Sequence, residues 1–384
     1  MFKESPLSTL IHFPLSHIST SVYDTSVDWI NKLPFLSLRA FLLWACKSLA
    51  DVKPIYQPVA LLIGLAMILR SKPAALTAVL PKLRDRPIYQ GLDKLPLLVW
   101  MMAQWQASQG DLSAGLYSWA HNLLPLVGND ECCTPRSLDL ILQFVEIILS
   151  NPEARTILVN RAVREGEPLI PPSSFEILVR LTFPPSSARV KAWSLYVCAQ
   201  ATKRFEKVYP LLKEVALAPE TATEGNAVEQ IFTFSLKLAG EGNSGLAKEA
   251  AAIAMWSVTE NVDCFKHWDI LYKEHLEASV ALLRKLVDEW KVHSPKLSSS
   301  PGDFITVNQT MNSFRLKNEK AITEGGANCS LYKEAEKSCK LISRRLLSRE
   351  SGGLEITHIT CVVLATAVAA AGGVAGAALA LCSH

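Results

Sequence analysis

Apolar residues recur with a helical period along most of the chain, from about residue 21 to residue 290. In stretches of roughly ten to twenty residues they fall at i, i+3, i+4 and i+7, and the stretches are cut by Pro, Gly or Asn. The stretch 136–150 (RSLDLILQFVEIILS), for example, ends at Asn151 and Pro152. No convincing alternation of apolar and polar residues predicts strands. The pattern therefore predicts an all-α protein.

Many short helices with short connections are typical of α-solenoids of the HEAT or armadillo kind. We therefore expect residues 1–292 to form a helical-repeat body. The next residues, 293–330, begin HSPKLSSSPGD and are polar, which predicts a linker. Two glycosylation sequons, at Asn308 and Asn328, fall in this range and should be empty if the body is cytosolic.

The segment 359–382, ITCVVLATAVAAAGGVAGAALALC, carries no charged residue. As a helix it would be about 36 Å long, enough to cross a hydrocarbon core of ~30 Å with some tilt. It predicts a transmembrane helix that begins at Ile359, continues through Val363 and ends at Cys382. The alternative is a buried helix at the end of a soluble domain, and the alanine-rich composition makes membrane insertion marginal.

Six basic residues precede the predicted span, and none follows it. They are Lys333, Lys337, Lys340, Arg344, Arg345 and Arg349. Because basic residues collect on the cytosolic side of a span, we expect the body to face the cytosol. Only Ser383 and His384 follow the span in this sequence, which is the pattern of a tail-anchored protein.

Gly372 and Gly376 form a G-x-x-x-G pair inside the predicted span. Small residues at this spacing let two helix backbones approach closely in lipid, which predicts a homo-oligomer through these two glycines. The same spacing also arises by chance in a segment so rich in alanine, so both interpretations stay open.

Residues 331–349 predict a basic amphipathic helix just before the span. Its apolar residues recur at helical spacing, with Lys and Arg on the other side. The apolar residues are Leu331, Ala335, Cys339, Ile342 and Leu346. Two interpretations stay open, a helix lying on the lipid surface and a solvated helix packed on the cytosolic body.

A second apolar stretch, residues 58–69 (PVALLIGLAMIL), ends before Arg70 and is shorter than the ~17 residues needed to span a bilayer. Residues 41–46 upstream are also apolar, but charged residues separate the two stretches. We expect a buried helix at 58–69. A membrane hairpin over 41–69 is the alternative.

The composition agrees with a folded protein, because 49% of the residues are apolar and 20% are charged. A mean hydropathy of +0.19 adds weight to the predicted span. The net charge of +3 gives no argument for a nucleic-acid partner. The nine cysteines include no C-x-x-C pair, which removes support for a zinc ribbon or a thioredoxin-type site. We interpret the thiols as reduced and the body as cytosolic.

The sequence contains no motif for nucleotide binding, zinc proteolysis or a nucleophile elbow. Ser118 and His121, near Asp111, would share one face of a helix, but a catalytic pair also needs an orienting acid and an oxyanion hole. Cys264 and His267 have C-x-x-H spacing with no second pair. We interpret both pairs as packing or surface residues, and we predict no enzyme activity, no cofactor and no metal.

Several short motifs are spread over nearly the whole chain. They are FKESPL at 2–7, PLSHI at 14–18, TSVDW at 25–29, KLP at 94–96, VWMMAQ at 99–104, GLYSWAHNLL at 115–124, SFEIL at 174–178, RFE at 204–206 and YPLLKEVAL at 209–217. Together they resemble the transmembrane protein 214 family, in its plant-type branch. The resemblance implies a protein of the endoplasmic reticulum membrane with a helical cytosolic body and no catalytic residue. It also implies a link to cell death under endoplasmic reticulum stress, where animal members recruit a procaspase.

The sequence departs from the family pattern in two places. Family members carry a long polar N-terminal extension that this sequence does not include. Residues 193–201 resemble an insertion, because in relatives the equivalents of Ala192 and Thr202 are close to adjacent. Animal members are often drawn with two spans, which keeps the hairpin over 41–69 open.

The leading hypothesis is a non-enzymatic scaffold or adaptor of the endoplasmic reticulum membrane, with protein partners on its cytosolic body. It follows from the predicted helix array, the predicted span and the lack of catalytic motifs. The alternative is a membrane-shaping or lipid-binding protein of the secretory pathway, with the lipid bilayer as the partner of residues 331–349.

Overall fold

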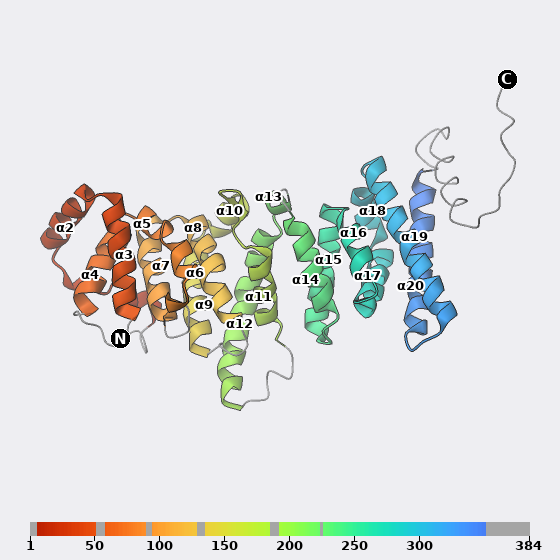
Figure 1. Ribbon diagram of the computed structural model, residues 1–384, viewed down its shortest axis with the longest axis horizontal. Coiled ribbons are helices and arrows are strands. Elements are labelled where there is room, and N and C mark those ends of the chain that lie inside the picture. Colours follow the sequence, from red (N-terminus) through yellow and green to blue (C-terminus); the bar gives the residue numbers. More distant parts are fainter. Residues whose placement is uncertain are drawn as a thin grey trace, which may run out of the picture. The chain divides into compact units, whose positions relative to one another are not determined.

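The structure is a computed structural model that describes residues 6–50, 58–89, 94–128, 135–184, 192–222 and 226–350 (Figure 1). Over these residues the chain is helical apart from one short β-hairpin, which confirms the all-α prediction. The chain forms two compact units, residues 1–282 and residues 283–384.

The first unit holds most of the helices. Along the chain they are α1 (Leu7–Leu10), α2 (Thr20–Lys32), α3 (Phe35–Ala50), α4 (Pro58–Ser71), α5 (Ala74–Thr77), α6 (Leu80–Asp85), α7 (Leu95–Gln109), α8 (Leu112–Ser118), α9 (Pro135–Leu149), α10 (Ala154–Val159), α11 (Pro172–Thr182), α12 (Ala192–Ala216), α13 (Pro219–Ala222), α14 (Ala227–Ala239), α15 (Ser244–Glu260) and α16 (Cys264–Leu271). Short 3-10 turns lie at η1 (Leu15–His17), η2 (Pro87–Tyr89) and η4 (Leu124–Val127), and η3 (Trp119–Leu123) is π-helical. Helix α17 (Leu276–Asp288) runs across the boundary between the units.

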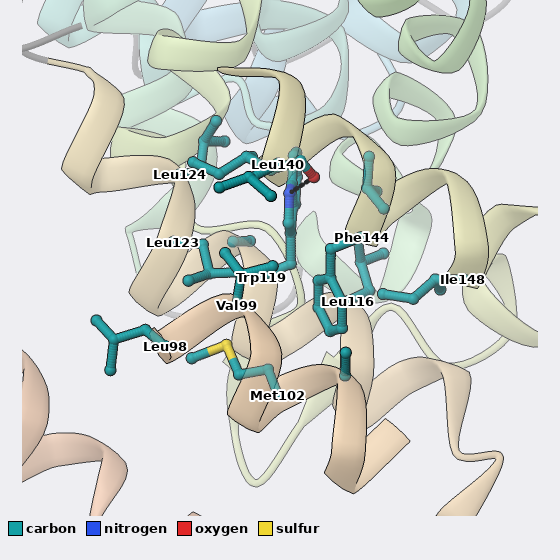
Figure 2. Close-up of a cluster of buried hydrophobic side chains, with 14 of the residues drawn as sticks. Leu98, Val99, Met102, Leu116, Trp119, Leu123, Leu124, Leu140, Phe144 and Ile148 are labelled. Atoms are coloured by element: carbon teal, nitrogen blue, oxygen red, sulfur yellow. Dashed lines mark hydrogen bonds between the residues drawn. The ribbon is translucent and has the colours of Figure 1, made fainter. Parts of the chain in front are cut away.

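Helices of the first unit pack on helices that are close to them in the sequence. Helix α4 packs on α7, α7 on α9, α9 on α12, α12 on α11, α11 on α14 and α14 on α15. Buried aliphatic and aromatic side chains fill the spaces between them, and one such cluster surrounds Trp119 (Figure 2). Burial of this apolar surface is the main stabilising term for the unit.

The sequence of helix α9 explains why a helix forms there and where it begins and ends. Its buried residues Leu138, Ile141, Leu142, Val145 and Ile148 follow the helical period and line one side. The helix begins at a proline, which suits the first helical position, and ends just before an Asn-Pro pair. The predicted range, 136–150, is therefore confirmed to within one residue.

A side-chain cap fixes the start of helix α15. The Asn243 carboxamide oxygen accepts from the backbone N–H groups of Gly245 and Leu246, at 3.1 and 3.4 Å, and so begins α15. The same amide group donates to the carbonyl oxygen of Phe183, at 3.1 Å, which ties α15 to the end of α11. A cap of this kind contributes about 1 kcal/mol.

The β-hairpin joins β1 (Val163–Arg164) to β2 (Glu167–Pro168) through a two-residue turn. Both turn residues, Glu165 and Gly166, have positive φ, at 54° and 79°. This is the type I′ pattern, whose twist matches that of the paired strands.

In the second unit, the prediction of a polar linker over 293–330 is wrong. The range contains helices, because α18 (Trp290–Leu297) and α19 (Pro301–Glu324) precede α20 (Cys329–Glu350). Ser300 and Asp303 form a capping box at the start of α19. Phe304, Val307, Met311 and Phe314 then give that helix a buried side.

Helix α4 contributes Leu61, Leu62, Leu65 and Leu69 to the core, in agreement with the buried helix expected at 58–69. Among the described residues, no single helix is both long and apolar enough to cross a membrane. Two pairs of consecutive helices reach that length and composition when the members of a pair are taken together. They are α2 with α3, bent by 117°, and α4 with residues 74–85, bent by 104°.

Residues 193–201 form the first turns of the continuous helix α12. Whether they are an insertion stays a prediction. The predicted span, with Ile359, Val363, Gly372, Gly376 and Cys382, lies outside the described residues.

Candidate functional site

The strongest candidate site is the exposed side of α20. The helix is amphipathic, as predicted, and its apolar residues Ala335, Cys339, Ile342 and Leu346 are buried. Helix α20 packs closely on α19. The sequence leaves two interpretations of 331–349 open, a helix on the lipid surface and a helix packed on protein. The structure shows that the apolar side of this helix packs on protein within the second unit.

Four basic residues form a line along the opposite side of α20. Lys333, Lys337, Lys340 and Arg344 are all exposed, and their spacings of four, three and four residues place them on one side of the helix. With a rise of 1.5 Å per residue, the line is about 16 Å long. We refer to these four residues as the basic row.

The other two predicted bases do not join the basic row. The Arg345 guanidinium donates to the carbonyl oxygen of Val287, so this side chain turns toward α17. The side chain of Arg349 lies outside the described residues. The sequence predicts six basic residues next to the membrane. In the structure, four of these six share one exposed surface.

The acidic residues of α20 offset the charge of the basic row only in part. The helix contains three, Glu334, Glu336 and Glu350. Glu334 pairs with Arg284. A carboxylate oxygen of Glu336 lies 3.2 Å from Arg315 Nε and 3.2 Å from Lys340 Nζ. Lys333, Lys337 and Arg344 thus leave the exposed side of α20 with a net positive charge.

Sequence reasoning missed Arg315, which faces Glu336 from α19. Because this pairing joins residues 21 positions apart, no local pattern reveals it. The available signal was the helical spacing of Phe304, Val307, Met311 and Phe314, which predicts that Arg315 lies on a helix rather than in a linker.

The structure gives Ser118, His121 and Asp111 separate packing roles. His121 Nε2–H donates to the carbonyl oxygen of Pro168 at 3.0 Å, and Nδ1 lies 3.8 Å from Glu167. Asp111 caps α8 by accepting from the Ala114 amide at 3.1 Å. Ser118 is buried. The geometry agrees with the packing interpretation of these residues.

Asp111 also anchors the β-hairpin, through a contact of 3.0 Å with Arg164. Burial by itself would raise the pKa of this carboxyl, but the Ala114 amide and the Arg164 guanidinium hold it below its ordinary value. On α8, the Tyr117 ring stacks on the His121 ring, and the Tyr117 hydroxyl donates to Glu167 at 2.5 Å. These contacts fasten the hairpin to α8.

We expect His121 to make stability depend on pH. Burial lowers the pKa of this imidazole below 6.5, while Pro168 and Glu167 oppose the shift. The unfolded chain therefore binds a proton more readily, and the free energy of unfolding should fall as the pH drops below about 6.5. Urea unfolding at about pH 7 and about pH 5.5 measures this loss, which should shrink in His121→Gln. Equal losses in both proteins would contradict the assignment.

The described residues contain no group of three or more His, Cys, Asp or Glu side chains placed to hold a metal ion. In the C-x-x-H pair, His267 Nε2 lies 3.1 Å from Glu229. Burial raises the pKa of the Cys264 thiol to about 12. A thiol with so high a pKa is a poor metal ligand and a poor nucleophile near neutral pH.

Fold and site together define an all-helical protein with a basic row on its last described helix. A family model described as "TMEM214, C-terminal, caspase 4 activator" matches residues 58–372, so the chain belongs to the TMEM214 family and the predicted resemblance is confirmed.

Relatives from two vertebrates agree with this assignment. Transmembrane protein 214-A of Xenopus laevis is 25% identical over 291 residues, which are 76% of this chain and 38% of that protein. Transmembrane protein 214 of Homo sapiens is 23% identical over 277 residues, 71% of this chain and 35% of that protein. The chain thus spans little more than a third of the length of these relatives. No solved structure matches it.

Proposed function

We propose that this protein is a non-enzymatic scaffold of the endoplasmic reticulum membrane whose helical body faces the cytosol. The observation that carries the proposal is the basic row, which lies on the N-terminal side of the uncharged segment 359–382. Positive charge at this place keeps the preceding part of a chain on the cytosolic side of a span. The names of the relatives, which are transmembrane proteins, support a location at a membrane.

In this proposal the body is an α-solenoid that recruits proteins. The support is the sequential packing of α4, α7, α9, α12 and α14 on helices near them in the sequence. Solenoids of this kind offer long surfaces for peptides and partner helices. The family description names a caspase activator, and we infer that the recruited partners act in cell death under endoplasmic reticulum stress.

A glycosylation map in microsomes tests the orientation. Asn328 is exposed in the turn between α19 and α20, whereas Asn308 is half-buried on α19. Asn328 is therefore the sensitive native site, and a sequon added after His384 reports on the far side of the membrane. We expect a glycan on the added sequon and none on Asn328.

The variant Asn328→Gln removes the native site. A glycosylated band that disappears in this variant therefore comes from Asn328 and not from the added sequon. A glycan on Asn328 would place the second unit in the lumen and would overturn the proposal. Unmodified protein that carbonate washes from the membrane would show that 359–382 does not span. To test the scaffold role, the membrane-inserted protein is purified in mild detergent, and the lack of any stoichiometric partner would count against it.

A lipid-binding or membrane-shaping role is the second candidate, and the basic row favours it. Clusters of Lys and Arg beside a membrane bind anionic headgroups, at about 1 kcal/mol per charge. Here the apolar side of α20 is already used within the second unit, so the attraction would come from charge alone.

A further inference from the structure

Helices α2 and α3 lie at the N-terminal end of the first unit (Figure 1). Both expose large apolar side chains. Trp29 is 62% exposed and Leu36 is 73% exposed. Val22, Phe35 and Trp44 are each more than two-fifths exposed. Single exposed apolar residues are common on proteins, but several within so short a stretch indicate a surface that contacts something other than water.

Helix α3 carries apolar residues on both its inner and its outer side. Its inner side, with Leu38, Leu42 and Ala45, is buried. Leu36, Ala40 and Trp44 follow one another at four-residue spacing on the outer side, and all three are exposed. Lys47, also exposed, lies about 20° from Leu36 around the helix, so it is on the same side. The outer side of α3 therefore combines large exposed apolar residues with one cation.

Helix α2 extends this surface. Val22 and Trp29 are seven residues apart, which places them on the same side of the helix. At about 100° per residue, Asp24 is offset by about 160° from Val22 and about 140° from Trp29, so it lies on the far side. Asp28 is offset by about 120° and about 100°, so it lies beside the apolar side of α2 and not on it.

Three cations, Lys32, Arg39 and Lys47, outnumber the two exposed acidic residues of α2, Asp24 and Asp28. The only charged residues of α3 are Arg39 and Lys47, and α2 ends at Lys32. A second copy of this chain, placed symmetrically against α3, would bring the same cations together, and like charges repel. Anionic lipid headgroups would instead complement them.

We propose that the outer side of α2 and α3, with Val22, Trp29, Leu36 and Trp44, rests in the boundary between headgroups and acyl chains of an anionic membrane. Tryptophan favours this boundary because its ring is amphipathic. The two helices have the length and hydropathy of a membrane segment only as a pair, and the 117° bend between them suits lying on the bilayer rather than crossing it. This contact is additional to the proposed span at 359–382 and does not depend on it.

A site-specific fluorescent probe in the full chain tests the contact. An environment-sensitive amino acid is placed at position 36 in one protein and at position 28 in the other, and thermal melting checks that both fold. Each protein is reconstituted into vesicles of phosphatidylcholine and phosphatidylserine, and vesicle-bound protein is collected by flotation. Acyl chains brominated near the headgroup should quench the probe at 36 at least about twofold more than the probe at 28, because interfacial helices insert to about 5–10 Å.

The outcomes separate lipid from the other occupants of the surface. Equal quenching at the two positions overturns the proposal, and so does an unquenched probe at 36. Protein that does not float with the vesicles also overturns it. If the probe at 36 is shielded without quenching, and the shielding disappears when protein is diluted per vesicle, the surface binds a second copy and the lipid contact is wrong.

Discussion

Replacing Trp119 by alanine is expected to lower the free energy of unfolding of the first unit by about 3–5 kcal/mol. The Trp119 side chain is fully buried between α7 and α9, with Val99, Leu123 and Phe144 around it (Figure 2). Alanine would remove most of the buried apolar surface of the ring and leave a cavity that its neighbours fill only in part. Urea unfolding followed by circular dichroism measures the loss.

The indole group also makes a polar contact, which separates two parts of the effect. Trp119 Nε1–H donates to the carbonyl oxygen of Ile141 at 3.1 Å, inside the core. Trp119→Phe keeps an aromatic ring but removes the indole donor of this hydrogen bond, so we expect a smaller loss of about 1–3 kcal/mol. Trp29→Ala is the matched control, because that exposed tryptophan should change the free energy of unfolding by only about 0.5 kcal/mol. Similar losses at positions 29 and 119 would contradict the assigned core.

The sequence predicts helices well where the apolar period is strong and the ends are marked. Helix α9 is such a case, because Ile141, Val145 and Ile148 repeat on one side and Asn151-Pro152 ends the stretch. Helix α19 is the opposite case. It buries Thr310 and Asn318 beside its apolar residues, so the stretch looks polar. The local signals of its start are the capping box at Ser300 and the proline at the first helical position, Pro301.

Only part of the candidate site can be predicted from the sequence, namely the part that depends on spacing within one helix. Helical spacing alone places Lys333, Lys337, Lys340 and Arg344 on one side of a helix. The inward turn of Arg345 depends on the carbonyl group of Val287, 58 residues away, and no local pattern contains it.

The exposed surface of α2 and α3 is harder still to predict. Helix α3 carries large apolar residues on both its inner and its outer side, so its sequence does not say which side faces the core. Only the packing of α3 on α4 and α5 shows that Leu36 and Trp44 point outward.

Replacing the four residues of the basic row by glutamine is expected to weaken binding to anionic vesicles by about 10²–10³-fold. Each basic residue near an anionic surface contributes about 1 kcal/mol, and every 1.4 kcal/mol is tenfold in affinity. Lys340 contributes less than its neighbours, because it already lies 3.2 Å from Glu336. A chain that ends at Glu350, which lacks the segment 359–382, allows reversible binding to be measured by vesicle sedimentation.

The control is a second chain with the same change in net charge, in which four exposed lysines of the first unit become glutamine. These are Lys203, Lys207, Lys237 and Lys273. If the basic row binds lipid, the control should keep most of its affinity, and the starting chain should lose binding as the salt concentration rises, because salt screens exposed charges. Equal losses in the two variants would show that net charge alone drives the binding. Unchanged affinity in the basic-row variant would remove the lipid role and leave the positive charge of α20 to set the orientation of the chain in the membrane.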